Sequence, residues 1–377
     1  MTRYERLMNS INGRPVDRPP VSFYEINGTE DINNADPFNI YNDSSWKPLI
    51  QLARDCTDRI VQLHIPFTDA SCDELPPEIV KKETAQEVES IYTTTTISAA
   101  RHKLIERTKR DKDVNTEWKI EHLLKSTEDL EAYLALPMPV PSVAPDISEF
   151  IATEQRLGDT GIAMICMGDP LGFAARLFNM EDYTIIALTE KKLFHQLLQR
   201  FFAILLPQIR AVAQALPGRL WRIAGPEFAS PPYLPPALFR EYVTDYDIQI
   251  VDIIKKSGGY PRIHSHGNLK KILDSIAATH CTGLDPIEPP PQGDVSLAYV
   301  REKYGKQMTL FGNLEASDIE TVPPEKFEEK ILAALKEGTA GDGRGFVLMP
   351  SACPYGRKLS TQSMKNYEKM IEVVNRY

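Results

Sequence analysis

Residues 260–267 read YPRIHSHG, a short apolar run that ends in two histidines. Seven other short apolar runs lie along the chain, and longer segments with helical period separate them. They span residues 20–24, 59–65, 162–167, 220–224, 283–287, 308–312 and 345–349. Short apolar runs that alternate with helices are typical of buried parallel strands. Eight of them predict an α/β protein with a (β/α)8 TIM barrel.

The intervening segments carry helical signals. Leu193, Leu197, Phe201 and Leu205 form an apolar stripe at i, i+4 spacing. We expect helices over residues 190–216, 237–256, 268–278, 296–304, 324–337 and 361–377. An open doubly wound sheet is the alternative architecture, but no predicted strand runs into the G-x-G-x-x-G turn that opens a helix in that fold.

One long segment interrupts the alternation between the second and third predicted strands. Residues 90–108 begin with a β-branched run that resembles a hairpin strand, and prolines are frequent over residues 137–145. We interpret residues 74–145 as an insertion or lid over one barrel face, within a single domain that spans residues 1–377.

Composition restricts the class of protein. The 377 residues include 43 Lys and Arg against 52 Asp and Glu, a formal net charge of −9. This acidic balance argues against a nucleic-acid partner, and no stretch approaches the roughly 18 apolar residues of a membrane span. The five scattered cysteines argue for a reducing compartment. We therefore expect a cytoplasmic enzyme that binds no nucleic acid and does not associate with a membrane.

Polar residues follow several predicted strands, where barrel enzymes hold their catalytic groups. Tyr24 follows the first strand, Glu227 the fourth and Cys353 the eighth, and Asp285 lies on the sixth. These positions make Tyr24, Glu227 and Asp285 candidate catalytic residues. Glu227 is suited to proton transfer, and Asp285 to orienting the substrate or a histidine. Helix capping or a solvated loop is the alternative role for Asp285.

His264 and His266 are the strongest signal for a site. Residues i and i+2 of an extended chain point the same way, so both imidazoles can face one point. Together with Cys353 and Glu227 they make a mixed N/S/O set that suits Zn²⁺. A metal-free hydrogen-bonding or acid–base pair, loop packing, and a nucleophilic pair of Cys353 with one histidine are the alternatives.

Several motifs together resemble the uroporphyrinogen decarboxylase superfamily, over essentially the whole chain. The similarity includes ERLM at residues 5–8, GRPVDRPP at 13–20, GDP at 168–170, GPE at 225–227, HSHG at 264–267, GNLE at 312–315 and the segment around Cys353. This resemblance implies a (β/α)8 barrel, in agreement with the count of predicted strands.

The superfamily contains two chemistries. True decarboxylases carry an arginine-rich loop after the first strand that binds the carboxylates of a porphyrinogen, whereas residues 23–28 read FYEING here. Their late Asn-Leu-Gly-His-Gly segment is replaced by PSACPYG at residues 350–356. The chain is more similar to the cobalamin-dependent methyltransferases, whose zinc motif is His-x-Cys with a distant Cys. His264, His266 and Cys353 match that motif with the middle cysteine replaced by histidine.

The resemblance implies a zinc-dependent methyltransferase that moves a methyl group from a small methylated donor to a corrinoid (cobalamin) protein. An imidazole in place of a thiolate makes zinc more Lewis-acidic, which favours O-demethylation of a donor such as a methoxylated aromatic. Uroporphyrinogen decarboxylase is the alternative activity. A non-catalytic barrel that docks a corrinoid protein is a third hypothesis.

Overall fold

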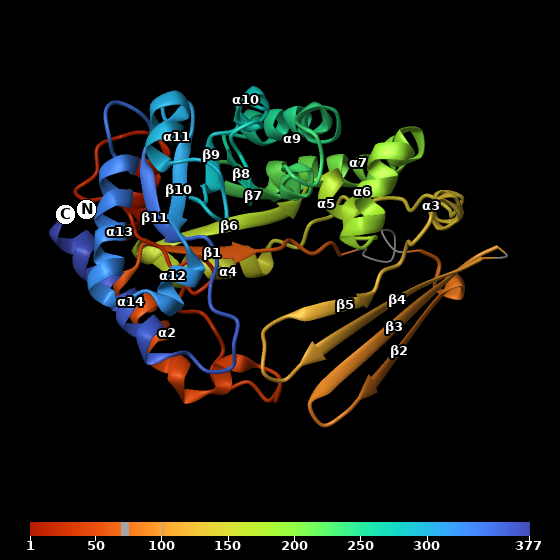
Figure 1. Cartoon of the computed structure of the whole chain (residues 1–377), viewed down its shortest axis with the longest axis horizontal. Coiled ribbons are helices and arrows are strands. Elements are labelled where there is room, and N and C mark those ends of the chain that lie inside the picture. The colour runs from red at the N-terminus through yellow and green to blue at the C-terminus, as the bar shows by residue number, and fades with distance from the viewer. Residues whose placement is uncertain (69–74, 101) are drawn as a thin grey trace.

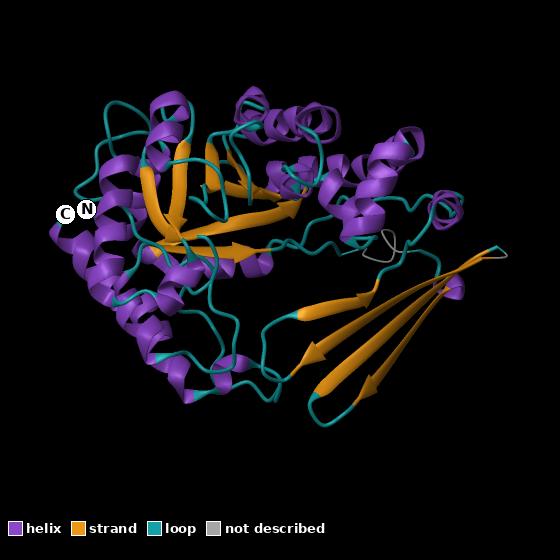
Figure 2. Cartoon of the chain, viewed as in Figure 1, coloured by secondary structure: helices purple, strands orange, loops and turns teal. Residues whose placement is uncertain are grey.

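A computed structural model describes residues 1–68, 75–100 and 102–377 of the chain. Within these residues the central element is a curled parallel sheet of seven strands in the order β1-β6-β7-β8-β9-β10-β11 (Figures 1 and 2). The strands are β1 (Arg59–Leu63), β6 (Gly161–Gly168), β7 (Leu220–Ala224), β8 (Tyr260–Ser265), β9 (Gly283–Pro286), β10 (Thr309–Leu314) and β11 (Phe346–Pro350). Each matches one of the runs predicted from sequence.

Helices surround the parallel sheet (Figure 2). They are α1 (Arg3–Ile11), α2 (Lys47–Cys56), α3 (Thr127–Leu134), α4 (Ser148–Leu157), α5 (Pro170–Ala175), α6 (Met180–Thr189), α7 (Lys191–Ala215), α8 (Pro236–Phe239), α9 (Asp245–Lys256), α10 (Leu273–Ala278), α11 (Leu297–Tyr304), α12 (Ala316–Thr321), α13 (Pro324–Gly338) and α14 (Thr361–Arg376). Helix α1 packs its Leu7 and Ile11 against the inward-facing side chains of the strands. None of the described helices has the length and apolar character needed to cross a bilayer.

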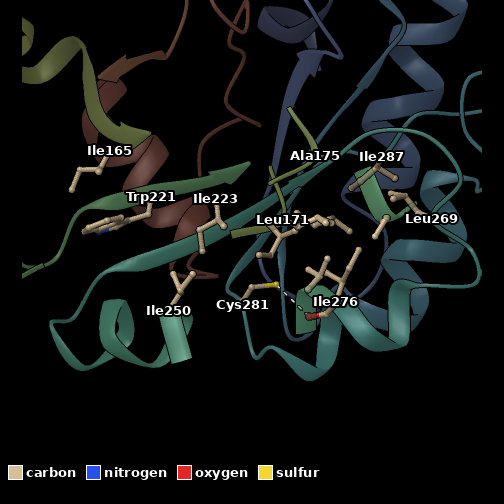
Figure 3. Close-up of a cluster of buried hydrophobic side chains, with 14 of the residues drawn as sticks. Ile165, Leu171, Ala175, Trp221, Ile223, Ile250, Leu269, Ile276, Cys281 and Ile287 are labelled. Carbon is tan, nitrogen blue, oxygen red and sulfur yellow. Dashed lines mark hydrogen bonds between the residues drawn. The ribbon is translucent and has the colours of Figure 1, made fainter. Parts of the chain in front are cut away.

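The core lies between the parallel strands and their helices. Figure 3 shows part of it, where Trp221 and Ile223 of β7 lie near Ile250 of α9. All three side chains are at most 1% exposed. Strands buried on both faces need such continuous apolar runs, which is why the runs were legible in the sequence.

The first predicted strand, residues 20–24, is wrong as a regular strand. The segment makes one parallel bridge to β11, Val21 with Leu348. Pro20 has no amide to donate to a ladder. Tyr24 has a φ of 59°, so the chain leaves the extended region there. The closed eight-stranded barrel predicted from sequence is therefore not seen, and a short irregular segment lies beside β11 instead.

Asp58, which is fully buried, fixes this irregular segment. Its carboxylate accepts hydrogen bonds from Arg6 at 2.6 Å, from Arg18 at 2.8 Å and from the amide of Val21 at 2.9 Å. The Asp58 amide donates in turn to the Val21 carbonyl at 2.7 Å. The segment is thus held next to the start of β1 largely through one side chain.

The chain between β1 and β6 forms a separate antiparallel sheet (Figure 1). Its strands are β2 (Val80–Gln86), β3 (Ser90–Ala99), β4 (His102–Asp111) and β5 (Glu117–Glu121), in sequence order. The β-branched run predicted as a hairpin strand is β3, which pairs with β4. Residue 74, the first residue of the predicted insertion, lies outside the described residues. The role of residues 74–145 as a lid stays a prediction.

The antiparallel sheet touches the segment that follows β11. The amide of Asn115, between β4 and β5, donates to the carbonyl of Tyr355 at 2.8 Å, and the amide of Arg357 donates to the carbonyl of Asp113 at 2.8 Å. The tip of this sheet therefore lies against the loop that carries Cys353.

Candidate functional site

The sheet register brings the predicted site residues of β7, β8 and β9 together. His264 is in register with Ala224 on one side and with Asp285 on the other. Two residues before His264 on β8, Arg262 is in register with Arg222 of β7 and with Gly283 of β9. Because parallel partners share a face, this part of the sheet carries charged side chains at successive levels below its carboxyl end.

His264, Asp285 and Arg262 form a fully buried charged chain. Nδ1 of His264 lies 2.8 Å from Oδ2 of Asp285, and Nε of Arg262 lies 2.9 Å from Oδ1. Each of the three residues is at most 2% exposed. Burial alone would raise the pKa of Asp285, but Arg262 and His264 outweigh it and hold the pKa well below its ordinary value.

These charges fix the state of His264. Burial lowers its pKa, so the ring is neutral near pH 7. Because ionised Asp285 only accepts hydrogen bonds, Nδ1 of His264 must carry the proton and Nε2 a lone pair. This tautomer is the one that suits a metal ligand or a base.

His266 repeats this arrangement with a different carboxylate. Its Nδ1 lies 2.8 Å from Oε1 of Glu288, whose Oε2 accepts the amide of Gly267 at 2.8 Å. Burial opposes the charged ring, but the Glu288 hydrogen bond and nearby carboxylates outweigh it and raise the pKa of His266. The two imidazole centroids lie 4.6 Å apart at 86°. Neither Nε2 atom has a hydrogen-bond partner in the described part of the chain.

Tyr24 lies beside the first histidine. Its ring centroid is 6.3 Å from that of His264, and its hydroxyl accepts a hydrogen bond from Nη2 of Arg222 at 2.9 Å. Burial raises the pKa of Tyr24 well above its ordinary value, so the hydroxyl keeps its proton. The structure thus places Tyr24 next to His264, and its catalytic role stays a prediction.

Glu227 and Cys353, the other two predicted ligands, have different partners in the structure. Glu227 accepts the amide of Gly225 at 2.8 Å and lines, together with His266, a cavity of about 310 Å³. The Cys353 thiol donates instead to Oε2 of Glu25 at 3.0 Å. Over residues 1–68, 75–100 and 102–377, no three His, Cys, Asp or Glu side chains are close enough to share a metal ion. The structure thus does not bring the four predicted zinc ligands together, and zinc binding stays a prediction.

Two arginines of the site were missed from sequence, whereas two glutamates near it lie in segments that the sequence had already indicated. Arg222 and Arg262 are charged residues inside otherwise apolar strand runs, and that contrast was a usable signal. Glu315, 5% exposed, lies near Glu288, and burial together with that charge raises its pKa to about 7. Glu25 was noted after the first strand, but its contact with Cys353 joins segments 328 residues apart.

Comparison with known proteins gives one family and one fold. The sequence profile described as "Uroporphyrinogen decarboxylase (URO-D)" matches residues 119–377. A search of curated protein sequences finds none that matches. Among solved structures, a methyltransferase from Methanosarcina mazei covers 100% of this chain and 99% of its own at 16% identity, with a TM-score of 0.61. That likeness shows the fold.

A second solved structure is a D-psicose 3-epimerase crystallised in the presence of D-fructose. It covers 62% of this chain and 92% of its own at 11% identity, with a TM-score of 0.32. A likeness that weak carries no argument about this protein.

Proposed function

The chain belongs to the uroporphyrinogen decarboxylase (URO-D) family, and from that premise we propose that it is a methyltransferase that moves a methyl group from a small methylated donor to a corrinoid protein. The observation that carries the proposal is the pair His264 and His266, whose Nδ1 atoms are both held by carboxylates. Metal-binding histidines are characteristically held in this way. Both Nε2 atoms are left for another partner.

Zinc is part of the proposal. His264 fits a metal by its tautomer, and both histidines fit one by their carboxylate partners. Cys353 and Glu227 are the proposed remaining ligands. Cys353 would have to leave Glu25 to join them, since its thiol donates to that carboxylate. Lewis acidity toward the leaving heteroatom of the donor is the chemistry that zinc would supply there.

The protein's own residues have separate roles in this scheme. Asp285 orients the ring of His264 and fixes its tautomer, and Glu288 orients the ring of His266. Glu227, where it is not a ligand, receives or returns the proton of the leaving group. Tyr24, which stays protonated, is a hydrogen-bond donor beside His264.

A decarboxylase role is less well supported by the same site. Glu25 occupies the loop after residue 24, and its carboxylate lines a cavity near the barrel mouth. A substrate with several carboxylates would be repelled there. Coproporphyrinogen formation by the purified protein would nevertheless overturn the methyltransferase proposal.

Metal analysis and a transfer assay test the proposal. The purified protein is expected to hold one zinc ion per chain, and the variants His264→Ala and His266→Ala are expected to lose it. His195→Ala is the matched control, because His195 also pairs with a carboxylate, Glu241 at 2.6 Å, but on helix α7. Stoichiometric zinc in His266→Ala would remove that residue from the ligand set.

The transfer assay uses reduced free cobalamin as the acceptor and a panel of methoxylated aromatics as donors. Absorbance of the methylated corrinoid is the expected product signal. Zinc-loaded protein that gives no methylated corrinoid, but binds a corrinoid protein tightly, would favour the non-catalytic docking barrel.

A further inference from the structure

A second cavity, about 380 Å³ in volume, opens beside the carboxyl ends of β1, β6 and β7. Apolar side chains such as Phe67, Met167, Phe173 and Leu205 make up much of its wall. Charged and polar side chains, among them Glu25, Arg176 and Arg222 of β7, line the rest of it. A cavity of this size, apolar with a few placed polar groups, is typical of a small-molecule site.

Arg222 is a half-buried cation in the middle of β7. Its Nη2 donates to the Tyr24 hydroxyl at 2.9 Å and its Nη1 to the Cys166 sulfur at 3.4 Å, which is a weak acceptor. Its Nε is buried and has no partner among the described residues. None of the Asp and Glu side chains in that part of the chain forms an ion pair with it. Asp285, the nearest carboxylate of the barrel interior, is already engaged by Arg262 and His264.

Buried guanidinium groups are costly unless an anion accompanies them. The guanidinium has five donors in a fixed fork that matches a carboxylate, and two donors are in use here. Resting on the proposed function, we infer that the cavity binds a methyl donor carrying one carboxylate on an aromatic ring, with Arg222 holding the carboxylate and the apolar wall holding the ring.

Glu25 places a negative charge on one side of the cavity. Its side chain lines the same cavity and keeps one oxygen on the Cys353 thiol. A second carboxylate on the ligand would meet this negative charge in a partly buried space and would be repelled. The cavity therefore favours an anion over a neutral ring, with Glu25 opposing a second carboxylate on its own side and Arg176 adding a second positive charge to the lining.

Calorimetric titration of the full-length protein tests the inference at pH 7.5. The probes are 3-methoxybenzoate and 3-methoxybenzamide, which have similar shape but differ in charge. We expect 3-methoxybenzoate to bind at least about tenfold more tightly than 3-methoxybenzamide. The amide cannot form the paired, charge-assisted hydrogen bonds that a carboxylate forms with the Arg222 guanidinium. Equal affinity for the two probes, or binding of neither, would overturn the inference. This comparison needs no variant, so it does not depend on any substitution folding.

Two variants locate the preference. Arg222→Gln is expected to bring the two affinities within about twofold of each other, and Arg222→Lys to keep part of the difference, since a charge remains but the fork does not. Arg219→Gln is the matched control, because Arg219 precedes the same strand at its other end and pairs with Glu154. A carboxylate preference that persists in Arg222→Gln would overturn the inference.

The transfer assay separates this inference from the proposed function. An Arg222-dependent preference for the carboxylate, without methyl transfer to cobalamin, would retain the binding site and reject the methyltransferase. Methyl transfer from 3-methoxytoluene as fast as from 3-methoxybenzoate would retain the methyltransferase and reject Arg222 as the carboxylate site.

Discussion

Replacing Asp247 with asparagine tests the electrostatics beneath the barrel mouth. Asp247 of α9 and Asp169, which caps α5, are both fully buried. Both carboxyl oxygens of Asp247 lack hydrogen-bond partners in the described part of the chain. Burial raises the pKa of Asp247 from 3.8 to about 8, so this group is protonated in the folded protein near neutral pH.

The sign of the pH effect follows from this shift. Between the two pKa values the folded protein holds a proton that the unfolded chain releases, so stability falls as pH rises through this window. The loss is at most about 1.4 kcal/mol per pH unit, or about 4 kcal/mol from pH 5 to pH 8. Asp247→Asn removes the titrating proton and should become progressively more stable than the wild type over the same interval.

Urea denaturation at several pH values between about 5 and 8 measures the difference in unfolding free energy. The matched control is Asp252→Asn on the same helix, since Asp252 is exposed and pairs with Lys256 at 2.6 Å. Its difference from wild type should stay flat with pH. A flat difference for Asp247→Asn as well would refute the neutral buried carboxyl.

Three further outcomes follow from contacts at the site. Asp285→Asn should lower the unfolding free energy by about 3–5 kcal/mol, because it leaves a buried guanidinium without its carboxylate; a loss under about 1 kcal/mol in urea would contradict that ion pair. Gly225→Ala should melt far below Gly218→Ala. Gly225 has a φ of +130°, and a Cβ added there would clash with Oδ1 of Asp169, whereas no atom lies within 4 Å of a Cβ added at Gly218. Equal melting temperatures for the two variants would reject this packing. Burial and the Glu25 carboxylate raise the pKa of Cys353, so Glu25→Gln should speed iodoacetamide alkylation of that thiol, and an unchanged rate would argue against the contact.

The parallel strands were predictable because burial on both faces demands a continuous apolar run. The segment at residues 20–24 has such a run but is not a strand, and the prolines at its start were the available warning, since they cannot donate to a ladder. β2 and β5 escaped prediction for the opposite reason. Most of their residues are exposed, so no apolar pattern marks them.

The site divides in the same way. His264 and His266 could be paired from sequence because i and i+2 positions of a strand share a face. The pairing of His264 with Asp285 depends on the register between β8 and β9, which no local pattern encodes. The contact of Cys353 with Glu25 depends on two loops at opposite ends of the chain. Short-range periodicity thus reveals which residues share a face, but not which distant face they meet.

The irregular segment beside β11 has a consequence for how the molecule opens. A regular ladder protects many successive amides. In this segment the Val21 amide donates to the Asp58 carboxylate and the Ser22 amide to the Leu348 carbonyl of β11, and no longer ladder follows among the described residues. We expect the barrel wall to open transiently at this segment, so that amide hydrogen exchange is faster at residues 20–24 than in β6 and β7. Because Tyr24 ends the segment and its ring lies beside that of His264, this opening would admit water next to the His264 ring.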